Sequence, residues 1–213
     1  MKTGFSIFIT FSVFIAVSCL SEMPDSISSD VTLNTSVAFP LGETSLGLND
    51  ISGFDERLLD ENPLTGKPFW KDSAEVILSY SMPFDIGDIY QTSEEIIQLT
   101  FRLNMYNGFP STVRGQFYFL DPYGFIQDSL FQDGPVELKK ATASDNGKIT
   151  FKPHEKKDIA FDSNRLDNLQ SVNKIRIYLV FSTSDVDDEL VQYYDEYLVD
   201  VQIGVKATLK FDL

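Results

Sequence analysis

The stretch 95–131 constrains the fold more than any other part of this chain, because it holds the clearest strand–turn–strand pattern. Apolar residues alternate with polar ones from Ile97 to Met105, and again from Val113 to Phe119. Strict alternation places one face of a strand on a core and the other toward water, whereas a helix would scatter the apolar side chains around its circumference. The sequence therefore predicts two half-buried β-strands here.

The segment between these two strands leaves two arrangements open. Asn107-Gly108 is typical of a two-residue hairpin turn, but such a turn would place Phe101 on the same face as Arg114. A loop with an odd number of residues instead sets Phe101 opposite Phe117, which keeps both apolar faces together. We therefore predict a hairpin with a three- or five-residue loop. The alternative is an arch, in which the two strands belong to different sheets that face each other.

The rest of the chain shows similar alternation and little sign of helix. We expect strands at 31–37, 44–48, 74–82, 136–141, 148–152, 157–161, 175–181 and 197–211, with a break at 39–42 and single helical turns near 51–59 and 166–172. The turn Asp121-Pro122-Tyr123-Gly124 fits type I chemistry. The last strand is so long that it must bend or switch sheets, for which Gly204 is the expected place. About ten strands with hardly any helix predict an all-β fold, an antiparallel β-sandwich.

The first nineteen residues are typical of an export signal and a lipid anchor. Lys2 is followed by an uncharged apolar run over 4–16, whose length fits a secretory signal and is short for a membrane span. The run ends in Ala-Val-Ser-Cys at 16–19, which resembles the lipobox of bacterial lipoproteins. The resemblance implies cleavage before Cys19, a diacylglyceryl group on its sulfur and an acyl group on its new amine. The alternatives are an uncleaved helix, or cleavage elsewhere that leaves Cys19 as a free thiol.

These signals predict three regions: a signal peptide at 1–18, a lipidated Cys19 with a flexible acidic tether at 19–30, and a single β-sandwich domain at 31–213. Several acyl chains hold a protein stably at a membrane, so the protein would be anchored there and would not span it. Acidic residues just behind the cysteine, Glu22 and Asp25, resemble the surface-export signals of lipoproteins from Bacteroidota. This resemblance implies the cell surface of the outer membrane, with the periplasmic face as the alternative.

The charge balance argues against one class of partner. Removal of Lys2 with the signal peptide leaves 16 of the 17 basic side chains against 32 acidic ones, a net charge of −16. Such a charge repels phosphate backbones, so we do not expect nucleic-acid binding. The same charge is typical of a soluble surface that resists association, and it could also attract a cationic partner.

Catalytic motifs are not visible in the sequence. His154 is the only histidine, with no Cys or second His beside it for zinc, and it reads as a solvated turn residue. No Gly-x-Ser-x-Gly elbow, glycine-rich phosphate loop or dinucleotide fingerprint occurs. Carboxylates are plentiful, but nothing selects a glycosidase pair. We expect no enzymatic activity and no resident cofactor, with a Ca²⁺ ion as the one candidate ligand.

The densest acidic cluster is a candidate cation site. Asp185, Asp187 and Glu189 have the alternate spacing that could point three carboxylates toward one Ca²⁺ ion. The EF-hand pattern is absent, because no Gly stands at its sixth position and no Glu at its twelfth. A solvated acidic loop is the alternative.

Three aromatic residues are candidates for binding. Tyr193 and Tyr194 follow the acidic cluster, and Trp70 is the only tryptophan. An exposed patch of such rings could bind a glycan or the edge of a protein. The alternative for Trp70 is a plug at the end of the sandwich.

Several short motifs resemble a pattern in uncharacterised cell-surface lipoproteins of Bacteroidota. They are Tyr-Asn-Gly-Phe-Pro at 106–110, Gln-Phe-Tyr-Phe-Leu-Asp at 116–121 and Asp-Ser-Leu-Phe at 128–131, with Phe-Pro-Leu-Gly at 39–42 and the strand 201–209. The resemblance covers about half of the mature chain and implies a β-sandwich on the outer membrane, without assignable catalytic residues. Our hypothesis is a non-catalytic, lipid-anchored protein that binds or scaffolds a partner, as an accessory subunit of an outer-membrane protein complex. The alternatives are a glycan- or Ca²⁺-binding surface module and a carboxylate-based hydrolase.

Overall fold

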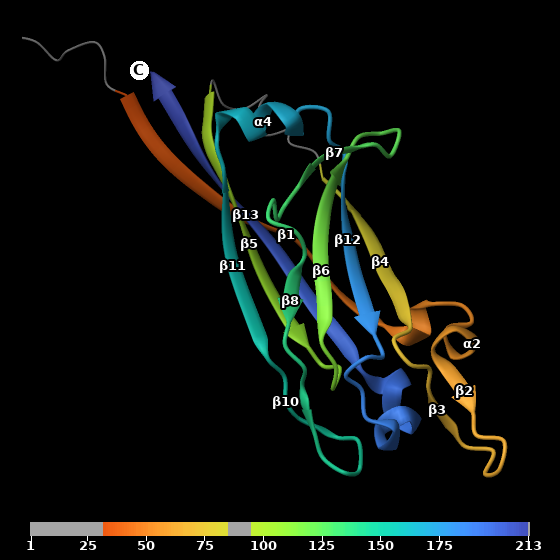
Figure 1. The fold of residues 1–213 in the computed structure, drawn as a ribbon. Coiled ribbons are helices and arrows are strands. Elements are labelled where there is room, and N and C mark those ends of the chain that lie inside the picture. Colours follow the sequence, from red (N-terminus) through yellow and green to blue (C-terminus); the bar gives the residue numbers. More distant parts are fainter. Residues whose placement is uncertain (1–31, 85–94, 213) are drawn as a thin grey trace, which may run out of the picture. The chain divides into compact units, whose positions relative to one another are not determined.

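The computed structural model describes residues 32–84 and 95–212 (Figure 1). The chain divides into two units, residues 1–33 with 212–213 and residues 34–211, and the second unit holds the fold. The predicted signal peptide, Cys19 and the tether lie outside the described residues. Within 32–84 and 95–212, no helix has the length and the apolar character needed to cross a membrane.

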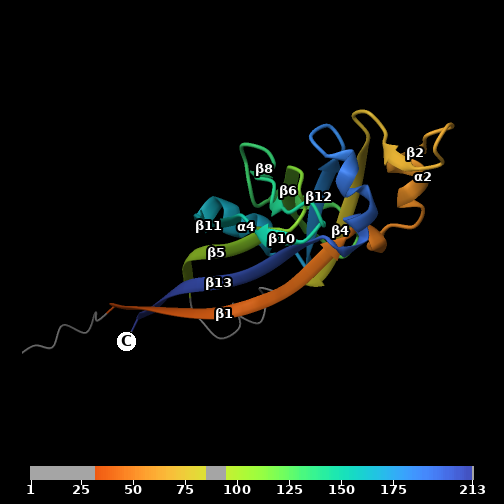
Figure 2. The same cartoon turned by 90° about the horizontal axis from the view of Figure 1, so that it is seen from below.

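Two antiparallel sheets form the fold, which confirms the predicted all-β sandwich. The first sheet has the order β1 (Thr32–Gly47), β13 (Leu198–Asp212), β5 (Glu95–Asn107), β11 (His154–Phe161). The second has the order β4 (Glu75–Pro83), β12 (Lys174–Ser182), β6 (Val113–Leu120), β7 (Ile126–Ser129), with β8 (Val136–Leu138) also on β6. Figure 1 shows both layers, and Figure 2 shows them from below, with β1, β13 and β5 side by side in one and β6, β12 and β4 in the other.

Short elements close the ends of the two sheets. Two ribbons pair β2 (Leu59–Glu61) with β3 (Pro68–Trp70) and β9 (Thr142–Ala143) with β10 (Ile149–Phe151). The helical segments are η1 (Leu48–Asp50), α2 (Phe54–Leu58), α4 (Ser163–Leu169) and η2 (Asp188–Glu196). α2 and α4 fall where the apolar spacing predicted single helical turns, and Asp162 caps α4 by accepting a hydrogen bond from the backbone N–H of Arg165.

The core lies between the inner faces of the two sheets. Phe101 of β5 meets Phe119 of β6 with ring centroids 5.1 Å apart, and Phe161 of β11 packs against both rings. All three rings are fully buried. Tilted and edge-to-face contacts of this kind add to the stabilisation that comes from removing the rings from water.

The predicted hairpin at 107–111 is wrong, and the arch is what forms. β5 pairs with β13 and β11, whereas β6 pairs with β12 in the other sheet. Asn107 is fully buried, and its amide nitrogen donates to the backbone oxygens of Ser111 and Lys139 at 2.8 and 2.9 Å. Its Oδ1 accepts from the N–H of Phe109. An arch keeps both apolar faces on one core as well as a hairpin does, and these buried hydrogen bonds stabilise the arch.

Two further expectations concern strand continuity: the break at 39–42 is wrong, and β13 does not switch sheets. β1 runs without a break through 39–42, because it is an edge strand and Pro40 needs no N–H on its free side. β13 stays in one sheet along its whole length. Its pairing with β5 shifts register between Thr208 and Leu209, not at Gly204.

Candidate functional site

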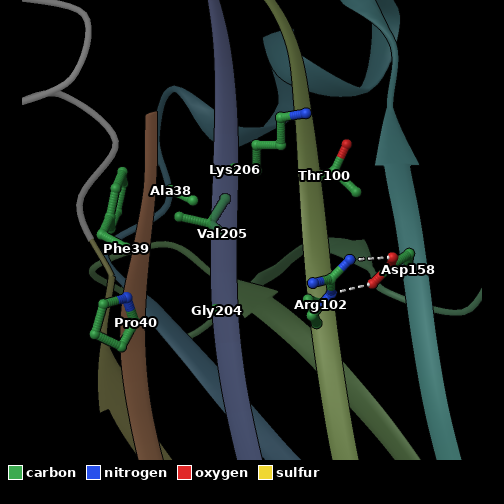
Figure 3. A pocket seen from close by; sticks show the side chains of 9 residues that line it. All are labelled: Ala38, Phe39, Pro40, Thr100, Arg102, Asp158, Gly204, Val205 and Lys206. Carbon is green, nitrogen blue, oxygen red and sulfur yellow. Dashed lines mark hydrogen bonds and ion pairs between the residues drawn. The ribbon is translucent and has the colours of Figure 1, made fainter. Parts of the chain in front are cut away.

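The outer face of the four-stranded sheet is hollowed along β13, between β1 and β5 (Figure 3). Three adjoining hollows of about 340, 330 and 570 Å³ share their linings. Pro40, Arg102 and Gly204 line the first and the second, and Glu43 and Gln202 line the second and the third. We call this continuous shallow depression the β13 groove.

Gly204 explains why the groove lies where it does. It sits on the outer face of β13, paired with Arg102 of β5. A Cβ atom added at Gly204 would meet only the backbone oxygen of Phe39, at 3.5 Å, which is ordinary van der Waals contact. The site could therefore hold a side chain, and glycine leaves that volume open. Gly204 thus hollows the sheet face at this position.

An ion pair forms one wall of the groove. Arg102 donates from Nε and Nη2 to the two carboxylate oxygens of Asp158 on β11, at 2.7 and 2.6 Å (Figure 3). The hydrogen bond from Arg102 lowers the pKa of the Asp158 carboxyl, and the same pairing raises the pKa of Arg102. Both side chains are exposed. Solvent therefore screens the pair, and its value to stability is small.

Polar and aromatic groups surround the other end of the groove. Asp200 accepts from Ser45 Oγ at 2.7 Å and from Lys152 Nζ at 2.9 Å. The ring of Tyr106 stacks on His154, with centroids 4.3 Å apart and planes 6° apart. His154 also lies 3.2 Å from Asn104 Oδ1, so its surroundings are those of an exposed strand residue with local partners. Alternation marks Arg102, Asn104 and Gln202 only as polar positions on the outer face of their strands, which does not identify a groove there.

The three candidate Ca²⁺ ligands have separate surroundings. Asp185 accepts from the N–H and the hydroxyl of Thr112, at 3.0 and 2.8 Å. Asp187 caps η2 by accepting from the N–H of Glu189, whose own side chain is exposed. In the described ranges, no three His, Cys, Asp or Glu side chains lie close enough to hold a metal ion. The structure therefore does not bring Asp185, Asp187 and Glu189 together.

The predicted aromatic patch is buried instead of exposed. Trp70 and Tyr194 are almost fully buried, with ring centroids 4.1 Å apart. Trp70 Nε1 donates to the backbone oxygen of Asp187, and burial raises the pKa of the Tyr194 hydroxyl, which lies 3.4 Å from Ser111 Oγ. Tyr193 is half-buried. Trp70 and Tyr194 cannot stack on a ligand, because their ring faces pack against other core side chains. Trp70 thus plugs the end of the sandwich, which was the alternative to a binding role.

One flank of the sandwich is apolar and carries few charges. The edge strands β1 and β4 meet there, where the side chain of Met82 lies within van der Waals reach of Gly42. Val37 on β1 and Ile77 and Tyr80 on β4 are between 42% and 49% exposed. In the stretch 34–47 the only charged residue is Glu43, and in β4 only Glu75 is charged. No other described strand pairs with the outer edge of β1.

Neither a protein-family model nor a curated protein sequence matches the chain. Among solved structures, the VP2 subviral particle of infectious bursal disease virus is similar at a TM-score of 0.37 and 8% identity, over 89% of this chain and 36% of that one. The enzymatically active domain of tailspike protein 4 from bacteriophage CBA120 scores 0.33 at 12% identity, over 89% and 20%. The K1 cleaved adhesin domain of Lys-gingipain from Porphyromonas gingivalis W83 scores 0.30 at 11% identity, over 82% and 97%. The chain thus spans about a third of the VP2 chain, and none of these similarities bears on what it binds.

Proposed function

We propose that this chain is a non-catalytic, lipid-anchored envelope protein that binds a protein partner at the outer membrane, as an accessory subunit of a membrane protein complex. The lipobox-like residues that end at Cys19 support the anchor, and the acidic residues behind Cys19 support a position at the cell surface. The observation that carries the binding role is β1, a long edge strand with an open outer edge in the described part of the chain.

An open edge is a binding surface in its own right. Apart from Pro40, which has no N–H, it presents a row of unpaired backbone N–H and C=O groups, with which a strand of another chain can pair. Soluble proteins commonly protect such edges with charges, yet the stretch 34–47 carries only Glu43. Val37 adds an exposed apolar side chain to β1 itself. A partner strand added to β1 would extend the four-stranded sheet and cover this edge.

The β13 groove lies beside this edge and offers specificity. Ala38, Pro40 and Glu43 line it from β1, so side chains of an added strand would point toward it. In strand addition, backbone hydrogen bonds supply affinity, and pockets for alternate side chains supply specificity. The hollow at Gly204 can take an apolar side chain beside Ala38 and Pro40, and the nearby Gln202 can hydrogen-bond to a polar one.

The carboxylates at the groove support a non-catalytic role. A general acid at neutral pH needs a raised pKa. The pKa of Asp158 is lowered, because Arg102 stabilises the charged form. Asp200 is held by Ser45 and Lys152.

A glycan is a second candidate for the groove, on the observation that three polar side chains able to hydrogen-bond lie together in its middle part. Arg102, Asn104 and Gln202 present a guanidinium and two amides along one wall and floor. Titration of the purified protein with oligosaccharides, followed by NMR shifts of these amide side chains, separates the two candidates. Saturable shifts with a sugar would favour this second function.

The partner role is tested with a matched pair of substitutions on the two edge strands of one sheet. Ala38 on β1 and Ala160 on β11 are both exposed. We expect Ala38→Lys to place a charge and a long side chain against the open edge, and to reduce recovery of the partner at least about tenfold, equivalent to 1.4 kcal/mol. The measurement is affinity capture of the full-length tagged protein from detergent-solubilised membranes of the source cell, with quantitative mass spectrometry.

Ala160→Lys is the control, because it adds the same side chain at the opposite edge. The proposal requires one protein, near equimolar with the bait, that co-purifies with the wild type and with Ala160→Lys but not with Ala38→Lys. Recovery of the wild-type chain alone and monomeric would contradict it. An equal loss of partner recovery in Ala38→Lys and Ala160→Lys would show that β1 is not the binding edge.

A further inference from the structure

The turn between β6 and β7 holds three large apolar side chains in solvent. Tyr123, Phe125 and Ile126 are 86%, 69% and 58% exposed. We call residues 121–126 the β6–β7 tip; it is the green loop beside the label β7 in Figure 1. Single exposed apolar side chains are ordinary, but three within four residues form a patch that suits an apolar or interfacial contact.

The tip is a rigid turn. The backbone N–H of Gly124 donates to the oxygen of Asp121, and the N–H of Asp121 donates to the oxygen of Phe125, both at 3.0 Å. Asp121 Oδ1 accepts from the N–H groups of Tyr123 and Phe125 at 2.9 and 2.8 Å. Gly124 has a φ of +91°, which only glycine adopts readily. Preorganisation of this kind lowers the entropy that binding would otherwise cost.

The carboxylate of Asp121, the only charged group of the tip, accepts these side-chain hydrogen bonds. Asp121 is the one charged residue between 120 and 127. Its Oδ1 serves the backbone of the turn, and its Oδ2 accepts from Gln127 Nε2 at 3.2 Å. The carboxylate is therefore directed into the turn, while the apolar side chains are exposed.

The base of the hairpin prevents the tip from folding back onto the core. Leu120 is buried and pairs with Ile126. Arg165 of α4 donates to both oxygens of Asp128 at 3.0 and 3.1 Å and to the backbone oxygen of Ser129 at 2.6 Å. Both members of this ion pair are largely buried. The hairpin is thus braced by a neighbouring helix, and its apolar side chains have no internal site to fill.

The tip lies at the same end of the second unit as Asn34, the first residue of that unit. That unit begins at Asn34 in β1, and Ser36 hydrogen-bonds Thr208, which pairs with Gln98 at the start of β5. β11 ends beside Leu99 and leads into α4, the helix that holds β7. The β10 ribbon and the β2–β3 ribbon lie at the opposite end (Figure 1).

The chain length between Cys19 and this end is short. Residues 20–31 link the proposed lipid anchor at Cys19 to Thr32, where β1 begins. A flexible chain of this length has a root-mean-square span of roughly 20 Å. An anchor at Cys19 would therefore keep this end of the fold close to the bilayer surface, where the effective concentration of lipid is high.

We propose that the β6–β7 tip inserts into the interfacial layer of the bilayer that holds Cys19; this rests on the lipid anchor proposed above. Tyrosine and phenylalanine suit that layer, because a ring can sit among the headgroups with its polar end wet. The expected surface is zwitterionic, since the chain without its signal peptide carries a net charge of −16 and anionic headgroups would repel it. Lipid and tip together make two points of attachment, which orient β1 relative to the membrane instead of leaving it free to rotate.

The test reads the depth of a tryptophan placed at the tip. Phe125→Trp in the full chain is compared with Leu64→Trp, which lies in the β2–β3 connection at the opposite end and is 93% exposed in the parent. Native Trp70 is buried and contributes the same background to both variants. Each protein is held on phosphatidylcholine vesicles whose acyl chains carry a nitroxide quencher. We expect emission from the tip tryptophan to fall about twofold or more, with no change for Leu64→Trp, because interfacial side chains reach about 5–10 Å into the headgroup and acyl boundary.

The anchor and the tip can fail separately in this design. Mass spectrometry of the purified chain first shows whether Cys19 is acylated, which tests the anchor. If Cys19 is a free thiol, it is the only cysteine, so coupling to a maleimide lipid supplies the tether and the quenching measurement proceeds unchanged. Equal quenching of the two variants, or none in either, overturns the tip proposal whatever the state of Cys19. Weaker quenching on vesicles that contain phosphatidylglycerol at low salt would support the expected preference for zwitterionic lipid.

Discussion

The two edge strands of the four-stranded sheet are protected very differently. β11 has eight residues, of which Glu155, Lys156, Lys157 and Asp158 are charged. The register places Glu155 and Lys157 on the core-facing side of this strand, where they form an ion pair at 2.8 Å. Between Asn34 and Gly47, β1 has only Glu43. Charges on both faces of an edge strand discourage another chain from pairing with it. The difference indicates that charged side chains guard one edge of the sheet and not the other, and the second edge is the one to which we assign the proposed partner.

The two edges are also attached to the core differently. β11 ends in Phe161, which is fully buried, directly before α4. β1 has a buried apolar side chain, Leu46, at its C-terminal end, whereas Val37 is about half exposed. Phe161 therefore attaches β11 to the core at the end near α4, and Leu46 attaches β1 at the opposite end. The substitutions below test or sharpen this comparison, beginning with the largest expected effect.

Removal of the β11 attachment is expected to cost the most stability. Phe161 packs on Phe101 and Phe119, and the guanidinium of Arg165 lies 3.5 Å over its ring. We expect Phe161→Ala to lower the free energy of unfolding by about 3–5 kcal/mol through lost burial and a new cavity. Chemical denaturation measures it. Phe39→Ala on β1 is the control, because Phe39 is only half-buried, and an equal loss there would contradict the comparison.

Leu46→Ala tests whether β1 is held at one end. Leu46 is 4% exposed, so we expect its truncation to cost about 2–3 kcal/mol of unfolding free energy, toward the lower end of the range for such substitutions. Val37→Ala, on the same strand but half exposed, should cost less than about 1 kcal/mol. Thermal or chemical unfolding of the two variants in parallel measures the difference. Similar losses would mean that β1 is held along its whole length.

Removing the core-facing charges of β11 should make it behave as an open edge. The double variant Glu155→Thr with Lys157→Val removes one acidic and one basic side chain, which form an ion pair, and leaves the net charge of the guarded strand unchanged. It should strengthen self-association at least about tenfold, or 1.4 kcal/mol. Analytical ultracentrifugation over a concentration series measures the change. Lys206→Thr on the central strand β13 removes a positive charge away from any edge and should leave association unchanged. A monomeric double variant would show that charge does not guard this edge.

The Arg102–Asp158 pair is expected to have the smallest effect. Arg102 lowers the pKa of Asp158 in the folded state, so the pair stabilises the fold above the unfolded-state pKa of about 3.9 and loses this contribution as pH falls through the folded-state pKa. Asp158→Asn should therefore melt slightly lower than the wild type near pH 7, and the two should converge in strong acid. Melting temperatures from pH 2 to 7 check it, and a gap that widens in acid would reverse the sign.

Local pattern predicted much of the secondary structure correctly. Alternation located β4, β12 and most of β13, and helical spacing located α2 and α4. The turn at Asp121 also has its expected hydrogen bond from the N–H of Gly124. These features depend on residues a few positions apart, which is the range over which side-chain period and turn chemistry act.

The candidate site was not predictable in this way. The β13 groove depends on Gly204 lying between β1 and β5, strands that are remote from it in sequence. Trp70 was assigned to a binding patch as one of two readings, and its burial is decided by contacts with Tyr194 and Phe181 more than a hundred positions away. The polar positions of the alternating strands marked an outer face, but not which part of that face would be hollow.

The sequence by itself determined that this chain forms half-buried strands with one apolar face each, because that face follows from the order of residues along a single strand. Only the tertiary structure decided which sheet each strand joins. A hairpin and an arch at 107–111 satisfy the same alternation, and the arch forms because Asn107 bonds to Lys139 and because the N–H of Gly108 bonds to the oxygen of Leu198. A Cβ at Gly108 would lie 2.5 Å from that oxygen. These partners come together only when distant segments pack, so no local pattern carries them.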